Sequence, residues 1–432
     1  MQISQMSSRT VALIAVVVSL VAMGQRSLAA PQVGPLDLSG SLNGAPYRIR
    51  VPAAWNGTLL VWVHGYRDKA DHPGEVDDRF AEIAPNASLE VALLGQGFAL
   101  AGSAFRDNGW VIQDGLQDTK DLVEFFRDTI ALPDHTILGS ASFGSLIAYE
   151  SMTKFGGLYD GAIAACGPGA GATRTWDTTA DLLIAYDAVF GMPPAWGTPA
   201  DVRDNLDFDT DVFAKLGSEV SIPANFPKFE FLRLVVGIPG RGLTPPAPPA
   251  FFPGWALTDL FLATEGRAEL ERRAGGPVVQ TAGHVYELSA AEKAYLASLG
   301  LPTAVVNAWL ASMNAEPPIV APFSSRNYLE RNGDFNGNFN DPVLSMHTVI
   351  DPLLPASHEA ALLETVRPSR QDNLFQTYTS GVGHCNFTGP QLLTALGAIQ
   401  LWVTTGERPV AAQFPAALGF VSNFSPPPFP QP

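Results

Sequence analysis

The chain has 432 residues, of which 46% are hydrophobic and 10% aromatic, so it can bury a sizeable core and is not a disordered protein. Only 16% of its residues are charged, while glycine (40 residues) and proline (36) are plentiful, which indicates a loop-rich globular protein rather than a coiled coil. The net charge of −16 argues against nucleic acid or an anionic membrane surface as a partner, because both bind a basic face.

The first thirty residues have the layout of a secretory signal peptide. Arg9 precedes the apolar run 11–23, and Ser27-Leu28-Ala29 supplies a small-x-small cleavage site. The run is short for a membrane span, so we expect cleavage after Ala29 rather than an uncleaved anchor. No later stretch of the sequence is long and apolar enough to span a bilayer, and the mature chain is expected to be secreted or periplasmic.

The following segment, taken as 30–166, alternates predicted strands and helices. The strands are 47–51, 59–63, 98–102, 136–140 and 161–166, and the helices are 114–130 and one that begins at about Phe143. The strand 59–63 (LLVWV) is apolar throughout, as expected where a parallel sheet is buried on both faces. This alternation predicts a largely parallel α/β sheet.

Regular alternation stops after Cys166 and resumes at Val343. The segment 167–342 between them is longer than a structureless loop inside a compact domain, so it is predicted to form a mostly helical cap. It contains Pro-rich joints such as 243–250. The sheet is expected to resume in 343–405, with strands 343–350 and 375–379 and helices 356–366 and 390–404, before a Pro-rich tail at 406–432 extends over the surface.

The sharpest chemical signal is the segment 139–144, Gly-Ser-Ala-Ser-Phe-Gly. It follows a short apolar strand and opens a helix, which is the context of a nucleophile elbow, the G-x-S-x-G turn. Such a turn exposes the hydroxyl of Ser142 and needs small neighbours, because it brings the strand and helix backbones close together. Ser140 stands where the pattern has its first glycine, and serine is still a small residue.

A second motif, His64-Gly65-Tyr66, directly follows the predicted strand 59–63. An acyl-transfer enzyme needs backbone N–H groups aimed at the oxyanion that develops on the attacked carbonyl. One is expected from Phe143, the residue after the nucleophile, and the other from Tyr66 in this early loop. Alone, the motif would be an ordinary tight turn, but the elbow downstream favours the oxyanion interpretation.

A candidate acid and a candidate base follow the serine in the chain order Ser142, Asp351, His384. His384 lies in a Gly-flanked loop after the last predicted strand, where it can take the serine proton. Asp351 ends the preceding strand, where its carboxylate can accept the imidazole N–H and fix the tautomer. Weaker candidates remain open, which are His347 and His358 for the base and Asp341 and Glu359 for the acid.

Together these segments resemble the α/β-hydrolase superfamily over roughly residues 35–166 and 343–405. The anchors are HGY at 64–66, SASFG at 140–144, HTVID at 347–351, GHC at 383–385 and LWVTTG at 401–406. The resemblance implies an eight-stranded, mostly parallel sheet with helices on both faces. It also implies a large, mainly helical cap inserted after the sixth strand.

The His-Cys pair at 384–385 is similar to that of secreted tannase and feruloyl-esterase-type enzymes, which bridge this cysteine to one immediately before the nucleophile. That position is Ala141 here, so the bridge is not carried over in that form. Cys166 ends the strand 161–166 at the sheet edge that also holds the elbow and the histidine loop. A Cys166–Cys385 disulfide is therefore the candidate bridge, with two buried free thiols as the alternative.

The sequence predicts neither a metal site nor a cofactor. The segment 334–341 (DFNGNFND) has oxygen ligands at alternate positions, as a calcium loop does, but it lacks Gly at the sixth position and Glu at the twelfth. A turn-rich return from the cap into the sheet is the favoured interpretation. The sequence contains no Cys/His cluster with zinc-site spacing and no phosphate-binding loop.

Three functions stay under consideration, with the oligomeric state left open. The first is a secreted serine hydrolase that cleaves carboxylic esters, small apolar acyl or aryl esters or polyesters, through an acyl-enzyme. The second is an exported peptidase or aminopeptidase, which would need an acid placed to bind the substrate amine. The third is a non-catalytic binding protein, and the complete set of nucleophile, base and acid argues against it.

Aromatic residues of the cap either line the cleft, which would indicate an apolar acyl or aryl group, or form the core of the cap. The second interpretation is favoured for most of them. They are Trp176, Tyr186, Phe190, Trp196, Phe229, Phe231, Phe251, Phe252 and Trp255.

Overall fold

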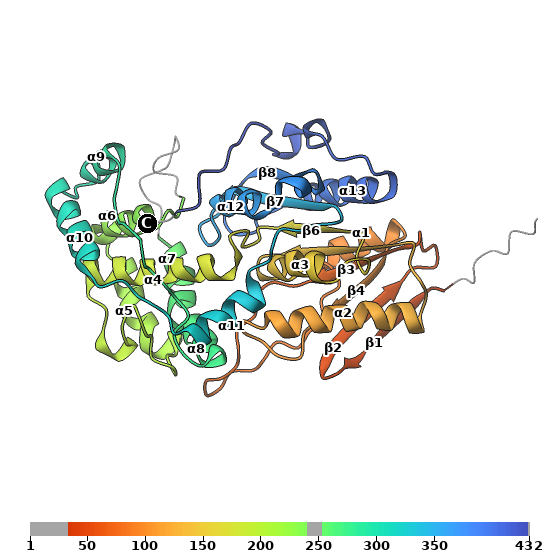
Figure 1. Ribbon diagram of the computed structural model, residues 1–432, viewed down its shortest axis with the longest axis horizontal. Helices are drawn as coiled ribbons and strands as arrows, with labels where there is room; N and C mark the ends of the chain where they lie inside the picture. Colours follow the sequence, from red (N-terminus) through yellow and green to blue (C-terminus); the bar gives the residue numbers. More distant parts are fainter. Residues whose placement is uncertain (1–32, 240–252, 431–432) are drawn as a thin grey trace, which may run out of the picture. The chain divides into compact units, whose positions relative to one another are not determined.

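The computed structural model describes residues 33–239 and 253–430 of the chain (Figure 1). The predicted signal peptide at 1–29 and the Pro-rich joint at 243–250 lie outside the described residues, as do Phe251 and Phe252. Within the two described ranges, no helix has the length and apolar character needed to cross a membrane.

Eight strands form one sheet in the order β1-β2-β4-β3-β5-β6-β7-β8. Their bounds are β1 Leu36–Leu42, β2 Ala45–Val51, β3 Thr58–Val63, β4 Ala99–Ser103, β5 His135–Ala141, β6 Gly161–Ala165, β7 Val343–Ile350 and β8 Leu374–Val382. β2 is antiparallel to β1 and β4, and every other neighbouring pair is parallel. The predicted mostly parallel, eight-stranded sheet is confirmed.

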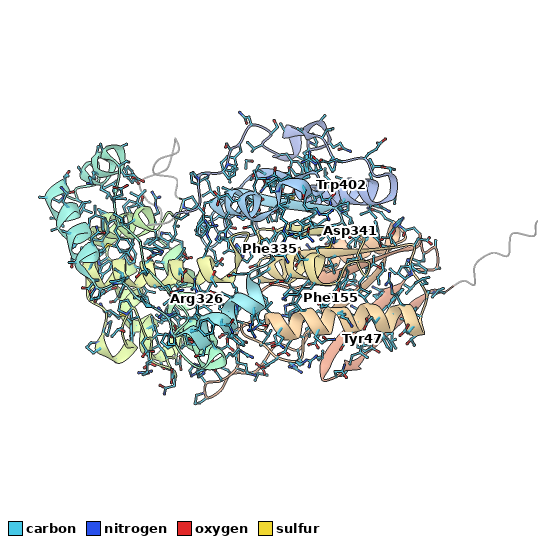
Figure 2. All side chains as sticks on the ribbon, viewed as in Figure 1. Tyr47, Phe155, Arg326, Phe335, Asp341 and Trp402 are labelled. Carbon is cyan, nitrogen blue, oxygen red and sulfur yellow. A yellow bond between two sulfur atoms is a disulfide. The ribbon has the colours of Figure 1, made fainter. Side chains whose placement is uncertain are left out.

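The central strands are apolar because helices cover both faces of the sheet. Leu59 and Val61 of β3 join one hydrophobic cluster and Leu60 joins another, as the alternation of a strand requires. The covering helices are α2 (Ile112–Thr129) and α3 (Phe143–Lys154) on the first face, and α1 (Ala87–Gly95) and α13 (Gly389–Thr405) on the second. Figure 2 shows Tyr47 and Trp402 on these opposite faces.

Between β6 and β7 the chain leaves the sheet and forms a helical cap, which confirms the predicted insertion after the sixth strand (Figure 1). Its α-helices are α4 Gly171–Phe190, α5 Phe213–Val220, α6 Phe226–Val235, α7 Trp255–Phe261, α8 Arg267–Ala274, α9 Ala290–Ser298, α10 Thr303–Ala315 and α11 Phe323–Gly333. Short 3₁₀ helices at Pro194–Trp196 and Pro223–Asn225 and π-helical segments at Phe208–Val212 and Leu262–Gly266 join some of them. Tyr186 stacks on Trp196, and Phe229 packs on Phe190, so these aromatic residues form the core of the cap as predicted.

After the cap, β7 and β8 complete the sheet with α12 (Ser357–Thr365) between them. Short 3₁₀ helices lie at Pro368–Asn373, Ala411–Gln413 and Ala416–Leu418. The end of the Pro-rich tail differs from the predicted surface segment. Phe429 is buried, because its ring packs 4.9 Å from the ring of His358 and 4.6 Å from the guanidinium of Arg174 on α4. The tail thereby reaches the boundary between the cap and the sheet domain.

Candidate active site

Ser142 lies in the tight turn between β5 and α3, at the edge of the sheet where the parallel strands end. Its backbone has φ 55° and ψ −128°, a conformation that residues other than glycine rarely adopt. α3 approaches β3 so closely that a Cβ on Gly144 would collide with the carbonyl oxygens of Val63 and His64. The strain and the close approach together are the geometry of a nucleophile elbow.

Ser140, the departure from the elbow pattern, is buried and hydrogen-bonded. Its hydroxyl donates to the carbonyl oxygen of Ile163 at 2.7 Å, and its oxygen lies 3.2 Å from Ser145 Oγ. The Ser145 hydroxyl donates in turn to the carbonyl oxygen of Ala165 at 3.0 Å. Because both carbonyl groups belong to β6, the extra hydroxyl ties the elbow to the neighbouring strand.

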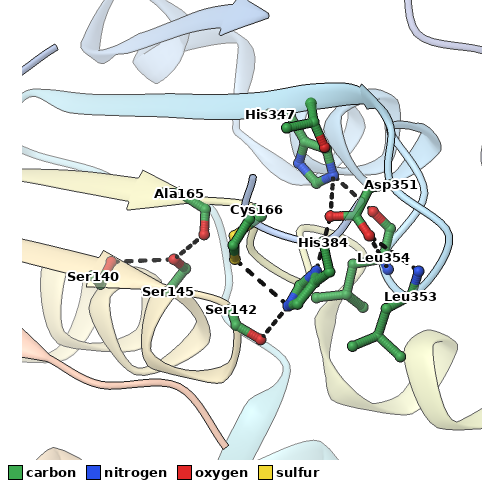
Figure 3. Close-up of a disulfide and its surroundings, with 12 residues drawn as sticks. Ser140, Ser142, Ser145, Ala165, Cys166, His347, Asp351, Leu353, Leu354 and His384 are labelled. Carbon is green, nitrogen blue, oxygen red and sulfur yellow. Dashed lines mark hydrogen bonds and ion pairs between the residues drawn. A yellow bond between two sulfur atoms is a disulfide. The ribbon is translucent and has the colours of Figure 1, made fainter. Parts of the chain in front are cut away.

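His384 connects Ser142 to Asp351 (Figure 3). Its Nε2 lies 2.7 Å from Ser142 Oγ, and its Nδ1 lies 2.8 Å from Asp351 Oδ2. The other carboxylate oxygen of Asp351 accepts hydrogen bonds from the backbone N–H groups of Leu353 and Leu354, both at 3.0 Å. An Nδ1–H that donates to the carboxylate leaves the Nε2 lone pair facing the serine hydroxyl. The structure thus brings the three predicted residues into one hydrogen-bonded relay.

Asp351 is fully buried, yet its surroundings favour the ionised form. Burial alone would raise its pKa, but His384 and His347 hold the pKa of Asp351 below its usual range. A carboxylate that stays ionised can orient the imidazole and stabilise an imidazolium ion.

The alternative histidines do not contact Ser142. His347 is buried behind Asp351, with Nε2 2.7 Å from the carbonyl oxygen of Leu354 (Figure 3). His358 accepts a hydrogen bond from a backbone N–H at 3.3 Å, and burial lowers its pKa to about 3. Both imidazoles therefore have other partners.

The alternative acids also lie outside the relay. Glu359 is buried and accepts hydrogen bonds from the hydroxyl of Ser345 at 2.6 Å and the amide of Gln376 at 2.8 Å. Asp341 precedes β7 (Figure 2), whereas Asp351 follows it, so the two residues lie at opposite ends of this strand. Of the three acids, only Asp351 has a position from which it reaches His384.

Tyr66 and Phe143, the predicted oxyanion donors, line the same cavity as Ser142. Phe143 is the first residue of α3, so its N–H has no partner within the helix. Burial lowers the pKa of His64 to about 4, so its ring is neutral and Nδ1–H donates to the carbonyl oxygen of Gly65 at 2.7 Å. Because the C=O and N–H of a trans peptide point in opposite directions, this bond turns the Tyr66 N–H away from His64.

The Cys166–Cys385 disulfide is present, with its Cα atoms 5.4 Å apart, and excludes the two-thiol alternative. It joins the residue after β6 to the residue after His384, and Figure 3 shows the bridge beside the imidazole. Both cysteines have positive φ angles, 47° at Cys166 and 51° at Cys385. The histidine loop is therefore covalently fixed to the strand edge next to the elbow.

The relay opens into a cavity of about 470 Å³ between the sheet domain and the cap. Much of its wall is aromatic, from Tyr66, Trp110, Phe143, Trp176, Phe261 and Phe429. Of the cap aromatic residues singled out from the sequence and described in the structure, Trp176 lines this cavity. Trp176 is therefore an aromatic residue of the cap that lines the cleft and does not only form the core of the cap.

The positions of the elbow, the acid and the histidine along the sheet identify the fold. The elbow follows β5, the acid follows β7 and the histidine follows β8, on a sheet whose only antiparallel pairs among the described strands involve β2. The chain has the α/β-hydrolase fold. No family model and no curated protein matches the chain.

Solved structures with this fold show weak similarity. An esterase from Aspergillus oryzae is 15% identical, with 86% of this chain and 80% of that chain covered and a TM-score of 0.41. Feruloyl esterase B from Aspergillus oryzae is 13% identical over 86% and 81% of the chains, with a TM-score of 0.36. Proline iminopeptidase from Mycobacterium smegmatis is 13% identical over 86% and 100%, with a TM-score of 0.40. The fold assignment rests on the strand topology and the backbone geometry of the elbow.

Asp259 and Phe429 are among the residues of this α/β-hydrolase cavity that were not expected from the sequence. Asp259 on α7 lines it from the cap, and Phe429 lines it from the tail. The signal for Asp259 is that it is the single charged residue of α7, WALTDLF. Phe429 had a weaker signal, a single aromatic residue among prolines.

Two groups of potential metal ligands occur among the described residues. One consists of Cys166, His384 and Cys385, whose sulfur atoms form the disulfide, and the other consists of Asp68, Glu75 and Glu265. Burial and the neighbouring Asp68 raise the pKa of Glu265 to about 8, so this carboxyl keeps its proton at neutral pH. In the segment 334–341, Asp334 accepts hydrogen bonds from the N–H and hydroxyl of Thr173 at 3.0 and 2.7 Å, a structural role that fits the predicted turn.

Proposed function

We propose that the chain is a secreted or periplasmic serine hydrolase that cleaves carboxylic esters through an acyl-enzyme on Ser142. The observation that carries this proposal is the hydrogen-bonded relay from Ser142 through His384 to Asp351 at the base of a cavity. A serine hydroxyl is a weak nucleophile until a positioned base takes its proton, and the relay supplies that base.

In the proposed reaction, Ser142 Oγ attacks the ester carbonyl carbon while His384 Nε2 takes the hydroxyl proton. The N–H groups of Tyr66 and Phe143 donate to the oxyanion, and Asp351 stabilises the imidazolium ion. His384 then gives the proton to the departing alcohol. Water, deprotonated by His384, attacks the acyl-enzyme and releases the acid and the free serine.

The aromatic wall of the cavity is the evidence for a substrate with an apolar acyl or aryl group, either a small ester or a unit of a polyester. Aromatic side chains line it on the sheet side and the cap side. Secretion is supported by the Cys166–Cys385 disulfide, because disulfides persist in oxidising compartments. A peptidase with the same relay is the second candidate, favoured by the acidic side chain of Asp259 in the cavity.

The test is a panel of p-nitrophenyl esters and aminoacyl p-nitroanilides, assayed with the wild-type enzyme and with Ser142→Ala. We expect ester hydrolysis that Ser142→Ala lowers by about 10⁴-fold or more in kcat. Ser298→Ala, a serine exchange at an exposed position of the cap, is the control and should retain turnover. Faster cleavage of the anilides would favour the peptidase, and equal ester turnover by Ser142→Ala and wild type would contradict the proposal.

A further inference from the structure

Asp259 is a buried carboxyl group that the proposed mechanism does not use. It lies on α7 with 8% of its surface exposed, and it lines the same cavity as Ser142 and His384. Its Oδ2 atom is buried and has no hydrogen-bond partner within the described part of the chain. A buried polar atom without a hydrogen-bond partner destabilises the folded protein, and a donor on a bound substrate would satisfy it.

The cavity offers this carboxyl group no counter-charge. Neither lysine nor arginine occurs among the described residues that line it. His384 is bound to Asp351, and burial lowers the pKa of His358 to about 3, so that imidazole is neutral. Burial and the negative charge of Asp351 raise the pKa of Asp259 well above its usual range. This shift favours the protonated carboxyl group while the cavity is empty. A cation that binds beside Asp259 stabilises the ionised form, so the carboxyl proton leaves to solvent and an ion pair forms, whereas an anion finds no positive partner here.

The surrounding wall is of the kind that binds organic cations. Trp110 and Trp176 meet edge to face with ring centroids 4.9 Å apart, and Phe261 and Phe429 also line the cavity. The faces of aromatic rings attract ammonium groups, most strongly where water is excluded. A cavity that combines aromatic walls with a carboxyl group lacking a counter-charge can bind an alkylammonium group.

We propose that this site takes esters or amides whose acyl group carries a protonated amine, with Asp259 as the binding partner of the ammonium group. The inference rests on the proposed hydrolase function and makes its substrate class more specific. The ammonium group supplies the missing counter-charge and donates a hydrogen bond to Oδ2, and a neutral alkyl chain supplies neither.

The kinetic test compares ω-amino p-nitrophenyl esters of increasing chain length with their methyl-ended and hydroxyl-ended isosteres. Asp259→Asn keeps the shape of the side chain and removes its ability to carry charge. We expect the variant to lower kcat/KM for the amino esters by about tenfold or more relative to its effect on the methyl-ended esters. Asp209→Asn, which removes one charge from an exposed position of the cap, should change neither series.

Two kinetic results would overturn the inference. An equal loss for amino-ended and methyl-ended esters would make Asp259 a structural residue. An equal loss for amino-ended and hydroxyl-ended esters would show recognition of a hydrogen bond without an ion pair.

A binding test separates this inference from the proposed function. In the Ser142→Ala background, hexylammonium and 1-hexanol are titrated while tryptophan fluorescence is recorded, since Trp110 and Trp176 line the cavity. We expect hexylammonium to bind about tenfold or more tightly than hexanol, and Ser142→Ala with Asp259→Asn to lose that preference. Equal affinities would overturn the inference even in an active esterase. A clear preference in a protein without hydrolytic activity would support the inference and contradict the proposed function.

Discussion

Five non-glycine residues of the described chain have positive φ angles, and three of them are Ser142, Cys166 and Cys385. Each such conformation costs about 1–3 kcal/mol and persists only where neighbouring contacts hold it. Here the contacts are the close packing of Gly144 against β3 and the disulfide itself. The backbone strain in this protein is therefore concentrated where the serine hydroxyl is exposed and the histidine loop is fixed.

The role of Asp351 is tested by Asp351→Asn, which keeps the size of the side chain but leaves no negative charge beside the imidazolium ion. We predict that kcat for ester hydrolysis falls by about 10⁴-fold while KM changes little, because the loss is in the transition state. Steady-state kinetics measure both values. The control is Asp341→Asn, at the opposite end of β7, which should retain activity. Comparable losses in both variants would remove Asp351 from its proposed role.

Single residues of the site differ in how far the sequence could predict them. Ser142, His384 and Asp351 follow strands in recognisable turns, so their local context indicated a common position at one edge of the sheet. Asp259 had no such context, because its place depends on how the cap lies against that edge. Helical periodicity shows that a cap residue is part of a helix and does not show which cavity it faces.

The connection between β6 and the histidine loop is the disulfide, which closes a sequence separation of 219 residues. We predict that Cys166→Ser with Cys385→Ser lowers the free energy of unfolding by about 2–4 kcal/mol. It should also lower kcat, because His384 loses its covalent anchor. Urea unfolding and ester kinetics measure the two effects. A double variant with wild-type stability and kcat would show that the bridge does not position the loop.

A pH effect on stability follows from Glu265, in the π-helical segment between α7 and α8. Burial raises its pKa from the ordinary 4.5 to about 8, with the neighbouring Asp68 acting in the same direction. Between these values the folded protein keeps a proton that the unfolded chain has released, so the contribution of Glu265 to stability falls as the pH rises. Glu265→Gln cannot ionise and avoids this loss.

We therefore predict that the melting temperature of Glu265→Gln rises relative to wild type by about 2 °C or more between pH 5 and pH 8.5. Differential scanning calorimetry at both pH values measures the change. Glu287→Gln, an exchange at an exposed position, should show no such trend. A Glu265→Gln difference that stays constant with pH would contradict the raised pKa.

Elements with a clear hydrophobic pattern were the ones the sequence could predict. β3 and β4 were expected because continuous apolar runs mark strands buried on both faces. β1 was missed because it is an edge strand, and its sequence LDLSGSL has mostly exposed or half-exposed residues. α1 was missed although Asn86 caps it, because its apolar residues do not lie on one face and Val91 is exposed.

In the whole molecule, the substrate cavity is built by three parts of the chain that are distant in sequence. The sheet edge supplies Ser142 and His384, the cap supplies Trp176 and Asp259, and the tail supplies Phe429. In the proposed hydrolase, the reacting groups are therefore separate from the part of the cavity wall that would select the substrate. Changes in the cap should alter the choice of substrate and leave the relay intact.

This separation is tested by Trp176→Ala, which enlarges the cavity on its cap side. We predict that the preferred acyl chain becomes longer, as measured by kcat/KM across p-nitrophenyl esters, while Ser142 remains reactive toward a fluorophosphonate. Trp309→Ala is the control, because Trp309 packs on Phe231 in the cap and does not line the cavity. An unchanged chain-length profile for Trp176→Ala would contradict the assigned role of the cap.

The central claim is that Ser142 is the nucleophile, activated by His384. The most direct measurement is peptide mass spectrometry of the purified protein after reaction with a fluorophosphonate, in wild type and in His384→Ala. The account predicts a single adduct on Ser142, formed rapidly in wild type and about 10³-fold or more slowly without the imidazole. An adduct on Ser140 or Ser145, or equal rates of labelling in the two proteins, would contradict it.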